Sequence, residues 1–311
     1  MEMGILAISL ILAFLGMPAP ADARMEEIKQ NLVSSVDFLS REIGERSWRD
    51  TDKLGRVASH IEEKFRAFGC KVKRQPFTYK KNTYYNIIGE VRGTGKADAG
   101  VLVIGAHYDT VRGSPGADDN ASGIAGLLEI ARLAAAHPLQ RTIRFVAFCL
   151  EEPPVFMTSR MGSYICAKSM KEEGARVHGM ISLEMLGFFC DRPGCQLYPL
   201  PGFKLFYPDC GNFIAFVGNI ASKPFTMSVK RAFMSASPLP VESLNAVSVI
   251  PGVSFSDHRS FWKFGYPAFM ITDTAFYRNP YYHGPGDKPS TLDYEKMAEL
   301  VAGLYKALGS L

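Results

Sequence analysis

The feature that most constrains the fold is an alternation of apolar runs and amphipathic stretches in the middle of the chain. Residues 100–106, 142–149 and 180–183 are short apolar runs of the kind found in buried strands. Residues 121–136 and 161–173 lie between them and place apolar residues at helical spacing. Continuous apolar strands that alternate with helices are typical of parallel strands covered on both faces. We therefore expect an α/β fold, a three-layer α/β/α sandwich with a mixed, mainly parallel central sheet.

The segments that flank this unit extend the same pattern. They predict helices over 25–43, 51–68, 223–236 and 294–308, and strands over 72–79, 85–91 and 267–271. Residues 190–250 are otherwise rich in Pro, Gly and aromatic residues and show no clear period. The chain of 311 residues is 47% hydrophobic, which is enough to fill one large core. Because it has no internal repeat and no linker-like segment, we expect residues 24–311 to form a single domain.

The first 23 residues resemble a signal peptide. The apolar run from Met3 to Met17 is shorter than the roughly 18 residues of a membrane span, and Ala21 and Ala23 fit an A-x-A cleavage site. However, Glu2 is the one charged residue before the run, where a signal usually carries Lys or Arg. We expect residues 1–23 to be cleaved and the protein to be exported, periplasmic or secreted. An uncleaved membrane anchor and a mistaken start site are the alternatives.

The cysteines are informative only at one place. Cys190 and Cys195 flank the turn-forming sequence Asp-Arg-Pro-Gly, so they can close a small disulfide loop in an exported protein. Two unpaired thiols are the equal alternative. The sequence has no C-x-x-C spacing, which argues against a cysteine zinc site.

The charge pattern excludes several classes of partner. The formal charge is +4, and Lys and Arg are spread along the chain without clustering. Nucleic acids and acidic membrane surfaces require a basic patch, so we expect neither as a partner. We also predict no stable protein partner.

Acidic residues and histidines gather at the ends of the predicted strands, where ligands bind in open α/β sheets. His107 and Asp109 are two residues apart, so on an extended chain they point to the same side. Each group by itself has an ordinary explanation, such as helix capping by Asp118 or Asn120, or a solvated strand end. The other acidic residues and histidines that we expect near these strand ends are Asp119 before a helix, Glu151 and Glu152 after a strand, Glu184 at a strand end, and His283 in a late loop.

Taken together, these residues point to one metal site. Adjacent carboxylates such as Glu151 and Glu152 are costly to bury unless a cation compensates them. The nitrogen and oxygen donors of the set suit zinc. Several independent coincidences at the same edge of the sheet are a poorer explanation than one shared ion.

At this point the chain resembles the co-catalytic di-zinc exopeptidases, the family that includes secreted bacterial leucyl aminopeptidases. Glutamate carboxypeptidases and glutaminyl cyclases are relatives. The likeness covers nearly the whole chain after Arg24 and is densest in AHYDT, PGADDNASG, LEE, SLEML, SDHRSFW and STLDY. It implies a zinc exopeptidase catalytic domain over 24–311 that binds two Zn²⁺. It also implies an aminopeptidase whose substrate is a peptide with a free N-terminus.

The resemblance also implies a role for each matching residue. His107 and Glu184 hold one zinc, Glu152 and His283 hold the other, and Asp119 bridges both. The peptide bond after Asp119 is cis in such enzymes. The family often has Asp at the position of Glu184, and the extra methylene changes the reach of the carboxylate.

The catalytic roles follow from the same likeness. Asp109 orients a metal-binding histidine, and Glu151 is the general base and acid that serves a zinc-bound hydroxide. Where secreted members place an oxyanion-binding Tyr near the S-D-H motif, this chain has Val253. Asp257 and His258 of that motif are expected as supporting residues or substrate contacts. Phe188, Phe189, Phe255 and Phe261 either line a specificity pocket or pack in the core.

Three alternatives remain open on the sequence. A glutaminyl cyclase would use a single zinc and the same ligands. A carboxypeptidase would need a cation for the substrate carboxylate, and Arg278 is the candidate. A non-enzymatic receptor-type module of this fold would lack part of the ligand set, whereas all the positions are filled here.

Overall fold

The computed structural model describes residues 21–96 and 100–311 of the chain. In that part, one eight-stranded sheet has the order β1-β2-β4-β3-β5-β8-β6-β7. Four neighbouring pairs are parallel and three are antiparallel, which confirms the mixed, mainly parallel sheet. The strands are β1 Lys71–Tyr79, β2 Asn82–Val91, β3 Val101–His107, β4 Ile143–Phe148, β5 Val177–Glu184, β6 Ile214–Asn219, β7 Val241–Ala246 and β8 Ala268–Thr272.

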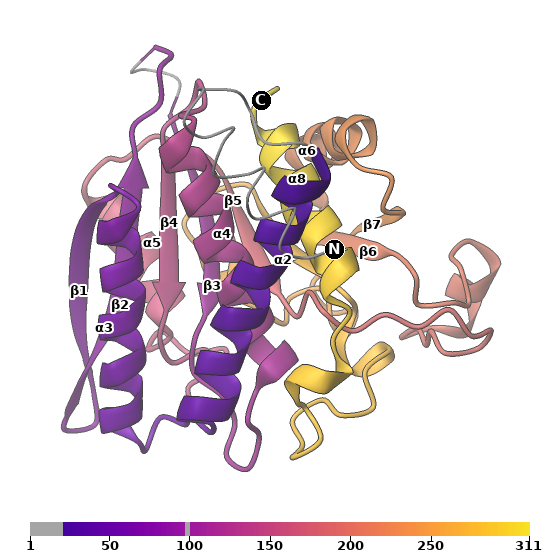
Figure 1. Cartoon of the computed structure of the whole chain (residues 1–311), viewed down its shortest axis with the longest axis horizontal. Helices are drawn as coiled ribbons and strands as arrows, with labels where there is room; N and C mark the ends of the chain where they lie inside the picture. Colours follow the sequence, from indigo (N-terminus) through magenta and orange to yellow (C-terminus); the bar gives the residue numbers. More distant parts are fainter. Residues whose placement is uncertain (1–20, 97–99) are drawn as a thin grey trace.

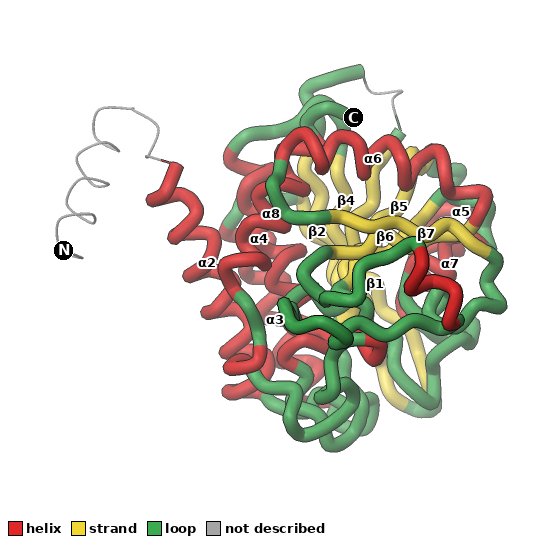
Figure 2. The backbone as a smooth tube through the Cα atoms, turned by 90° about the vertical axis from the view of Figure 1, so that its right-hand side faces the viewer, coloured by secondary structure: helices red, strands yellow, loops and turns green. Residues whose placement is uncertain are grey.

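Helices cover both faces of this sheet and complete the expected three layers (Figures 1 and 2). One face carries α2 (Ala21–Asp37), α3 (Thr51–Ala67), α4 (Gly123–Ala136), α6 (Lys223–Ala236) and α8 (Tyr294–Leu308). The other face carries α5 (Gly162–Glu172) and α7 (His258–Trp262). A short π-helical segment, Phe38–Ile43, continues α2, and another, Ala117–Ser122, precedes α4.

The local sequence explains where the predicted helices begin and end. The Asp50 carboxylate accepts a hydrogen bond from the Lys53 amide and caps α3, while Gly69 after its end has φ of +89°. Asp293 caps α8 in the same way through the Lys296 amide. The apolar stripe of α3 is buried against the sheet.

The predicted signal peptide, residues 1–23, lies outside the described residues except for its last three, which begin α2. Among residues 21–96 and 100–311, no helix combines the length and apolar character needed to cross a membrane.

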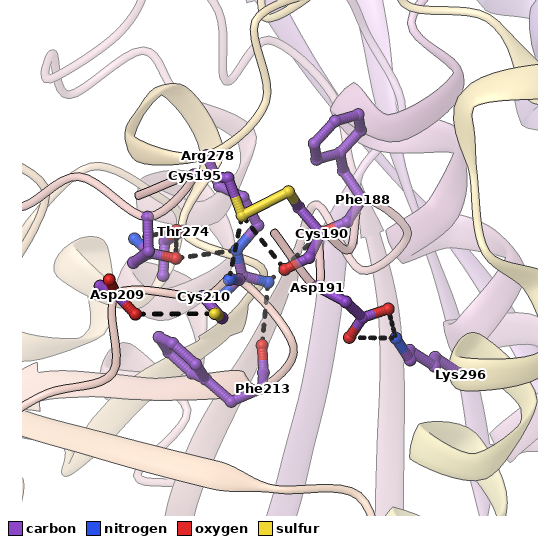
Figure 3. Close-up of a disulfide and its surroundings, with 12 residues drawn as sticks. Phe188, Cys190, Asp191, Cys195, Asp209, Cys210, Phe213, Thr274, Arg278 and Lys296 are labelled. Atoms are coloured by element: carbon purple, nitrogen blue, oxygen red, sulfur yellow. Dashed lines mark hydrogen bonds and ion pairs between the residues drawn. A yellow bond between two sulfur atoms is a disulfide. The ribbon is translucent and has the colours of Figure 1, made fainter. Parts of the chain in front are cut away.

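The segment between β5 and β6 leaves the sheet and forms a long loop, where the sequence shows no clear period. Cys190 and Cys195 form a disulfide there, and Cys190 and Gly211 are joined by an antiparallel bridge. Figure 3 shows the disulfide beside Arg278, whose Nε donates to Gln196 Oε1 at 2.8 Å and whose Nη1 donates to the Phe213 carbonyl at 2.9 Å. The buried guanidinium thus holds the base of this loop, and β6 follows it directly.

The strand directions decide where a site can form. β3, β4, β5 and β8 are mutually parallel neighbours, so their carboxyl ends meet at one edge of the sheet. His107 and Glu184 are the last residues of β3 and β5. The structure therefore delivers the predicted ligands to the same edge.

Candidate metal centre

Five of the predicted residues form two groups that share one carboxylate. His107 Nε2 lies 3.4 Å from Asp119 Oδ1 and 3.3 Å from Glu184 Oε1. His283 Nε2 lies 3.2 Å from Asp119 Oδ2 and 3.4 Å from Glu152 Oε2. Each oxygen of Asp119 faces a different group, which is the arrangement that a bridging ligand requires.

The spacing of the donor atoms fits zinc. Ligand atoms about 2.1 Å from a tetrahedral zinc ion lie about 3.4 Å from one another. The donor separations of 3.2–3.4 Å within both groups match this value. Imidazole nitrogen and carboxylate oxygen are zinc's usual protein ligands outside cysteine sites. The residues present therefore fit a zinc pair in geometry and in chemistry.

The electrostatics of the protein alone also call for a cation. Glu151 and Glu152 are 5% and 4% exposed, and Glu152 Oε1 has no hydrogen-bond partner among the described residues. Burial raises the pKa of Glu151 well above its usual range and that of Glu152 to about 7. For Asp119, burial is outweighed by the imidazoles of His107 and His283, which lower its pKa. A bound cation would stabilise the ionised carboxylates that burial disfavours.

Asp109 holds the strand end that carries the two glutamates. Its Oδ1 accepts the Glu151 amide at 3.0 Å, and its Oδ2 accepts the Glu152 amide at 3.1 Å. His107 Nδ1 lies 3.1 Å from the main-chain carbonyl of Asp109 and 3.7 Å from its Oδ1. The predicted orientation of His107 is thus supplied mainly by the backbone of Asp109, while the carboxylate fixes Glu151 and Glu152.

Asp287 makes the equivalent contact on the opposite side of the site, and the sequence reading missed it. Its Oδ1 accepts the Asp118 amide at 2.7 Å, and its Oδ2 accepts the Asp119 amide at 3.1 Å. The signal for it was a carboxylate four residues after His283 in the same Gly-rich loop. Asp287 therefore holds the backbone of Asp118 and Asp119 in the same way as Asp109 holds the backbone of Glu151 and Glu152.

Neighbouring polar residues tie this turn to β5. Asn120 Oδ1 accepts the amides of Gly123 and Met185, both at 3.1 Å, so it serves as the expected helix cap and also bridges to β5. Asp118 does not cap: its Oδ1 accepts the Gly187 amide at 2.9 Å, and its Oδ2 accepts Asn279 Nδ2 at 2.8 Å.

A fully buried arginine, Arg46, supports the loop that joins His107 to Asp119. Its guanidinium donates to the carbonyls of Tyr108, Pro115 and Gly116 at 2.7–2.9 Å. Burial lowers the pKa of Arg46 to about 10, so the group still carries its charge at neutral pH. No periodic pattern surrounds Arg46 in the sequence, so the sequence alone does not predict this role.

The backbone around the ligands adopts unusual conformations. Leu150, Met185 and His283 have φ of +63°, +53° and +58°, values that cost of order 1–3 kcal/mol each away from glycine. His283 is a predicted ligand, Met185 follows Glu184, and Leu150 precedes Glu151. The Asp119–Asn120 peptide bond is cis, as the family resemblance implied.

The longer side chain at Glu184 has its own partner. Ser256 Oγ donates to Glu184 Oε2 at 2.7 Å, and Ser256 is in turn 2.9 Å from Ser182 Oγ. This bond leaves Oε1 directed at His107. The extra methylene relative to the family's usual Asp is thus accommodated with the carboxylate fixed at both oxygens.

The remaining predicted residues have different placements. Asp257 and His258 are fully buried, and His258 Nε2 bonds the Val253 carbonyl at 2.9 Å, so His258 supports the loop. Burial raises the pKa of Asp257 to about 7 and lowers that of His258 to about 4. Arg278 is 5% exposed and engaged in the disulfide loop, so it does not reach the site as the carboxypeptidase hypothesis required.

Beside Glu184 lies a cavity of about 100 Å³ between the sheet and three segments, residues 196–207, 251–255 and 274–282. Val253 and Phe255 line it, and Val253 offers no hydroxyl for an oxyanion. Phe261 is packed in the core and Phe188 packs on Tyr281, so neither lines this cavity. Phe189 also lies outside it, against the edge of the main core. Only Phe255 of the four phenylalanines is a wall of the cavity.

Comparison with solved structures supports the fold. A zinc aminopeptidase from Bacillus subtilis, BSAP, superposes with a TM-score of 0.69 at 17% identity, over 90% of this chain and 95% of that chain. A glutaminyl cyclase from Bacteroides thetaiotaomicron superposes with a TM-score of 0.67 at 18% identity, over 91% of this chain and 98% of that chain.

Comparison of sequences places the chain in a family. The uncharacterized protein YfbL of Escherichia coli is 42% identical over 90% of this chain and 87% of its own length. A probable leucine aminopeptidase of Arthroderma otae is 26% identical over 78% of this chain and 60% of its own length. The sequence model of peptidase family M28 matches residues 86–307 of this chain. With the ligand geometry described above, these matches show that the chain belongs to peptidase family M28.

Proposed function

We propose that this protein is a zinc-dependent aminopeptidase that binds two zinc ions and removes residues from the amino end of peptides. The observation that carries the proposal is the pair of donor groups that share Asp119, with Glu151 beside them. His107, Asp119 and Glu184 would hold one ion, and Asp119, Glu152 and His283 the other. The relatives that are named as aminopeptidases support cleavage from the amino end of the peptide.

The bound ions would supply Lewis-acid chemistry, lowering the pKa of water and polarising the scissile carbonyl. Glu151 is the residue placed to move the proton. It lies in a group with His107 and Glu152, and its amide is fixed by Asp109. Its carboxylate would accept a proton from the attacking water and deliver it to the leaving amine. Glu151 is buried, so few water molecules compete for that proton between the two steps.

The charge balance supports two ions rather than one. Two Zn²⁺ carry four positive charges, and Asp119, Glu152 and Glu184 supply three negative ones. The remaining positive charge favours an anionic oxygen nucleophile or the carbonyl oxygen of the substrate. A single ion would leave one of the two buried donor groups uncompensated.

The direct test is turnover of aminoacyl-aminocoumarin substrates by purified protein, with and without added zinc. We expect release of the free amino acid and no activity after chelation. A glutaminyl cyclase is the second candidate, because a structural neighbour is one. Mass spectrometry of glutaminyl peptides separates the two, because cyclisation loses ammonia and leaves the N-terminal residue in place, whereas hydrolysis releases it.

We also propose that the working enzyme is exported. The apolar segment before Ala23 and the Cys190–Cys195 disulfide support this, because disulfides persist mainly in oxidising compartments. N-terminal sequencing of the protein recovered from its native cells tests the proposal. A mature chain that begins at Arg24 is expected, and a chain that begins at Met1 in the cytosol would contradict it.

A further inference from the structure

The cavity beside Glu184 has one feature that an apolar pocket does not need, a carboxylate at the end remote from the metal ligands. Glu184 pairs with Thr272, Thr272 with Ala215, and Ala215 with Glu242, so these residues form one row across β5, β8, β6 and β7. Direct partners in neighbouring strands project from the same face of the sheet. Glu184 and Glu242 therefore stand at opposite ends of the same cavity floor, and both line it.

The length of this row matches a long side chain. Three strand spacings of about 4.8 Å place the Cα atoms of Glu184 and Glu242 about 14 Å apart. The carboxylate of Glu184 and the backbone of a bound substrate would occupy the first part of that distance. With bonds of about 1.5 Å, an arginine side chain reaches about 7 Å from its Cα, which brings its cation within contact of the Glu242 carboxylate.

The walls between the two ends are apolar. Phe213, Val253 and Met270 form one continuous buried cluster along the cavity. Such a surface suits the methylene stem of a long side chain, whose charged head must then find a partner at the far end. A short aliphatic side chain would not reach the Glu242 end of the cavity, which would stay filled with water.

Three aromatic residues stand around the Glu242 end. Tyr198, Phe203 and Tyr207 line the cavity, and their rings stack on one another with centroid separations of 5.7–6.2 Å. The Tyr207 hydroxyl donates to the Ser243 carbonyl at 3.0 Å, which fixes the ring beside Glu242. Aromatic faces next to a carboxylate are a favourable environment for a guanidinium or ammonium group.

Glu242 has one cation near it already, and that contact is long. Lys230 Nζ lies 4.0 Å from Glu242 Oε2 and donates instead to Ser243 Oγ at 3.2 Å. Glu242 keeps 35% of its side chain exposed, so it remains open to a second, closer partner. A substrate cation at ordinary hydrogen-bond distance would compete well with this contact.

We propose that Glu242 and the aromatic cluster of Tyr198, Phe203 and Tyr207 select substrates whose N-terminal residue is arginine or lysine. The proposal rests on the proposed aminopeptidase function and names its substrate class. Glu242 acts here as a specificity-determining residue, remote from the reacting atoms.

The test compares arginyl- and citrullinyl-aminocoumarin, which have the same shape and differ in charge. We expect kcat/KM of the zinc-loaded wild type to favour arginine by about tenfold, the low end for a hydrogen bond to a charged group. Glu242→Gln should bring the ratio within about threefold of one, and Lys230→Met should raise it. Glu63→Gln, the same change at an exposed position on α3, should leave it unaltered.

A wild-type ratio near one, or a ratio unchanged in Glu242→Gln, would overturn the proposal while leaving the aminopeptidase function intact. If no aminoacyl substrate is turned over, the proposed function fails instead. In that case, calorimetric titration of the zinc-loaded protein with arginine and with citrulline tests whether the cavity binds arginine selectively. Tighter binding of arginine that is lost in Glu242→Gln supports it, and equal binding of the two refutes it.

Discussion

The substitution Asp109→Asn isolates the contact that fixes the catalytic strand end. Asp109 accepts two consecutive amides, those of Glu151 and Glu152, at 3.0 and 3.1 Å, and it is fully buried. Asparagine retains one accepting oxygen and presents an N–H group to the other amide. One charge-assisted bond is lost and one buried amide is left without an acceptor.

The size of the effect follows from these two losses. A hydrogen bond to a charged group contributes about 1.5–3 kcal/mol, and an unsatisfied buried donor costs about 1–3 kcal/mol. Taking the lower part of each range gives about 3 kcal/mol in the free energy of unfolding. Since the displaced amides belong to Glu151 and Glu152, zinc affinity and kcat should fall together, by about 10–100-fold.

Urea unfolding followed by circular dichroism measures the first quantity, and zinc titration against a competing chelator measures the second. Asp50→Asn is the matched control, because Asp50 also accepts a backbone amide, that of Lys53 at 3.0 Å, but caps α3 at the surface. It should lose no more than a few tenths of a kcal/mol, because asparagine caps a helix about as well as aspartate, and it should lose no zinc affinity. Equal losses of stability in the two variants, with zinc affinity within twofold of wild type, would refute the role of Asp109.

Other changes test the roles of Glu151, the buried carboxylates and the disulfide. Glu151→Gln should keep both zinc ions but lower kcat by about a hundredfold or more, and near-normal turnover would refute its role as the base. Zinc binding near pH 6.5 should release protons, because burial raises the pKa of Glu152 to about 7 and contacts with Asp119 and Glu152 outweigh burial to raise that of His283 to about 10. Both folded-state values lie above the unfolded ones, so the metal-free protein should lose stability as pH rises from about 4.5 to 10, while zinc affinity rises. Calorimetry in buffers of different ionisation enthalpy counts these protons, and a count of zero would contradict the charge balance. Replacing Cys190 and Cys195 by serine should cost about 2 kcal/mol for so short a loop, and an unchanged urea midpoint would argue against a stabilising disulfide.

Most of the donor residues that the structure brings together are tied to a strong local pattern in the sequence. His107, Glu152 and Glu184 end or follow apolar runs, and parallel strands bring such ends to one edge of the sheet. The helices α6 and α8 were predicted with the bounds that the structure shows, since their apolar residues repeat at helical spacing. The family resemblance then predicted which donor residues group together, which their spacing in the sequence could not.

The residues that support the ligands were harder to predict. Arg46 and Asp287 act through the backbone of segments far away in sequence, so no local pattern marks them. Strand β7 was missed because it is an edge strand with every residue half-buried, which leaves no alternation to read. Strand β6 was not predicted either, because it follows the long irregular segment that contains the Cys190–Cys195 disulfide. These same unpredicted segments supply Glu242 and the aromatic cluster, so the specificity proposal became available only with the structure.

The proposed mechanism requires a zinc pair held by two donor groups that share Asp119. Anomalous scattering from crystals of the zinc-loaded protein, collected on both sides of the zinc absorption edge, tests it most directly. We expect two peaks, one among His107, Asp119 and Glu184 and one among Asp119, Glu152 and His283. A single peak under zinc-saturating conditions, or zinc bound away from these residues, would contradict it.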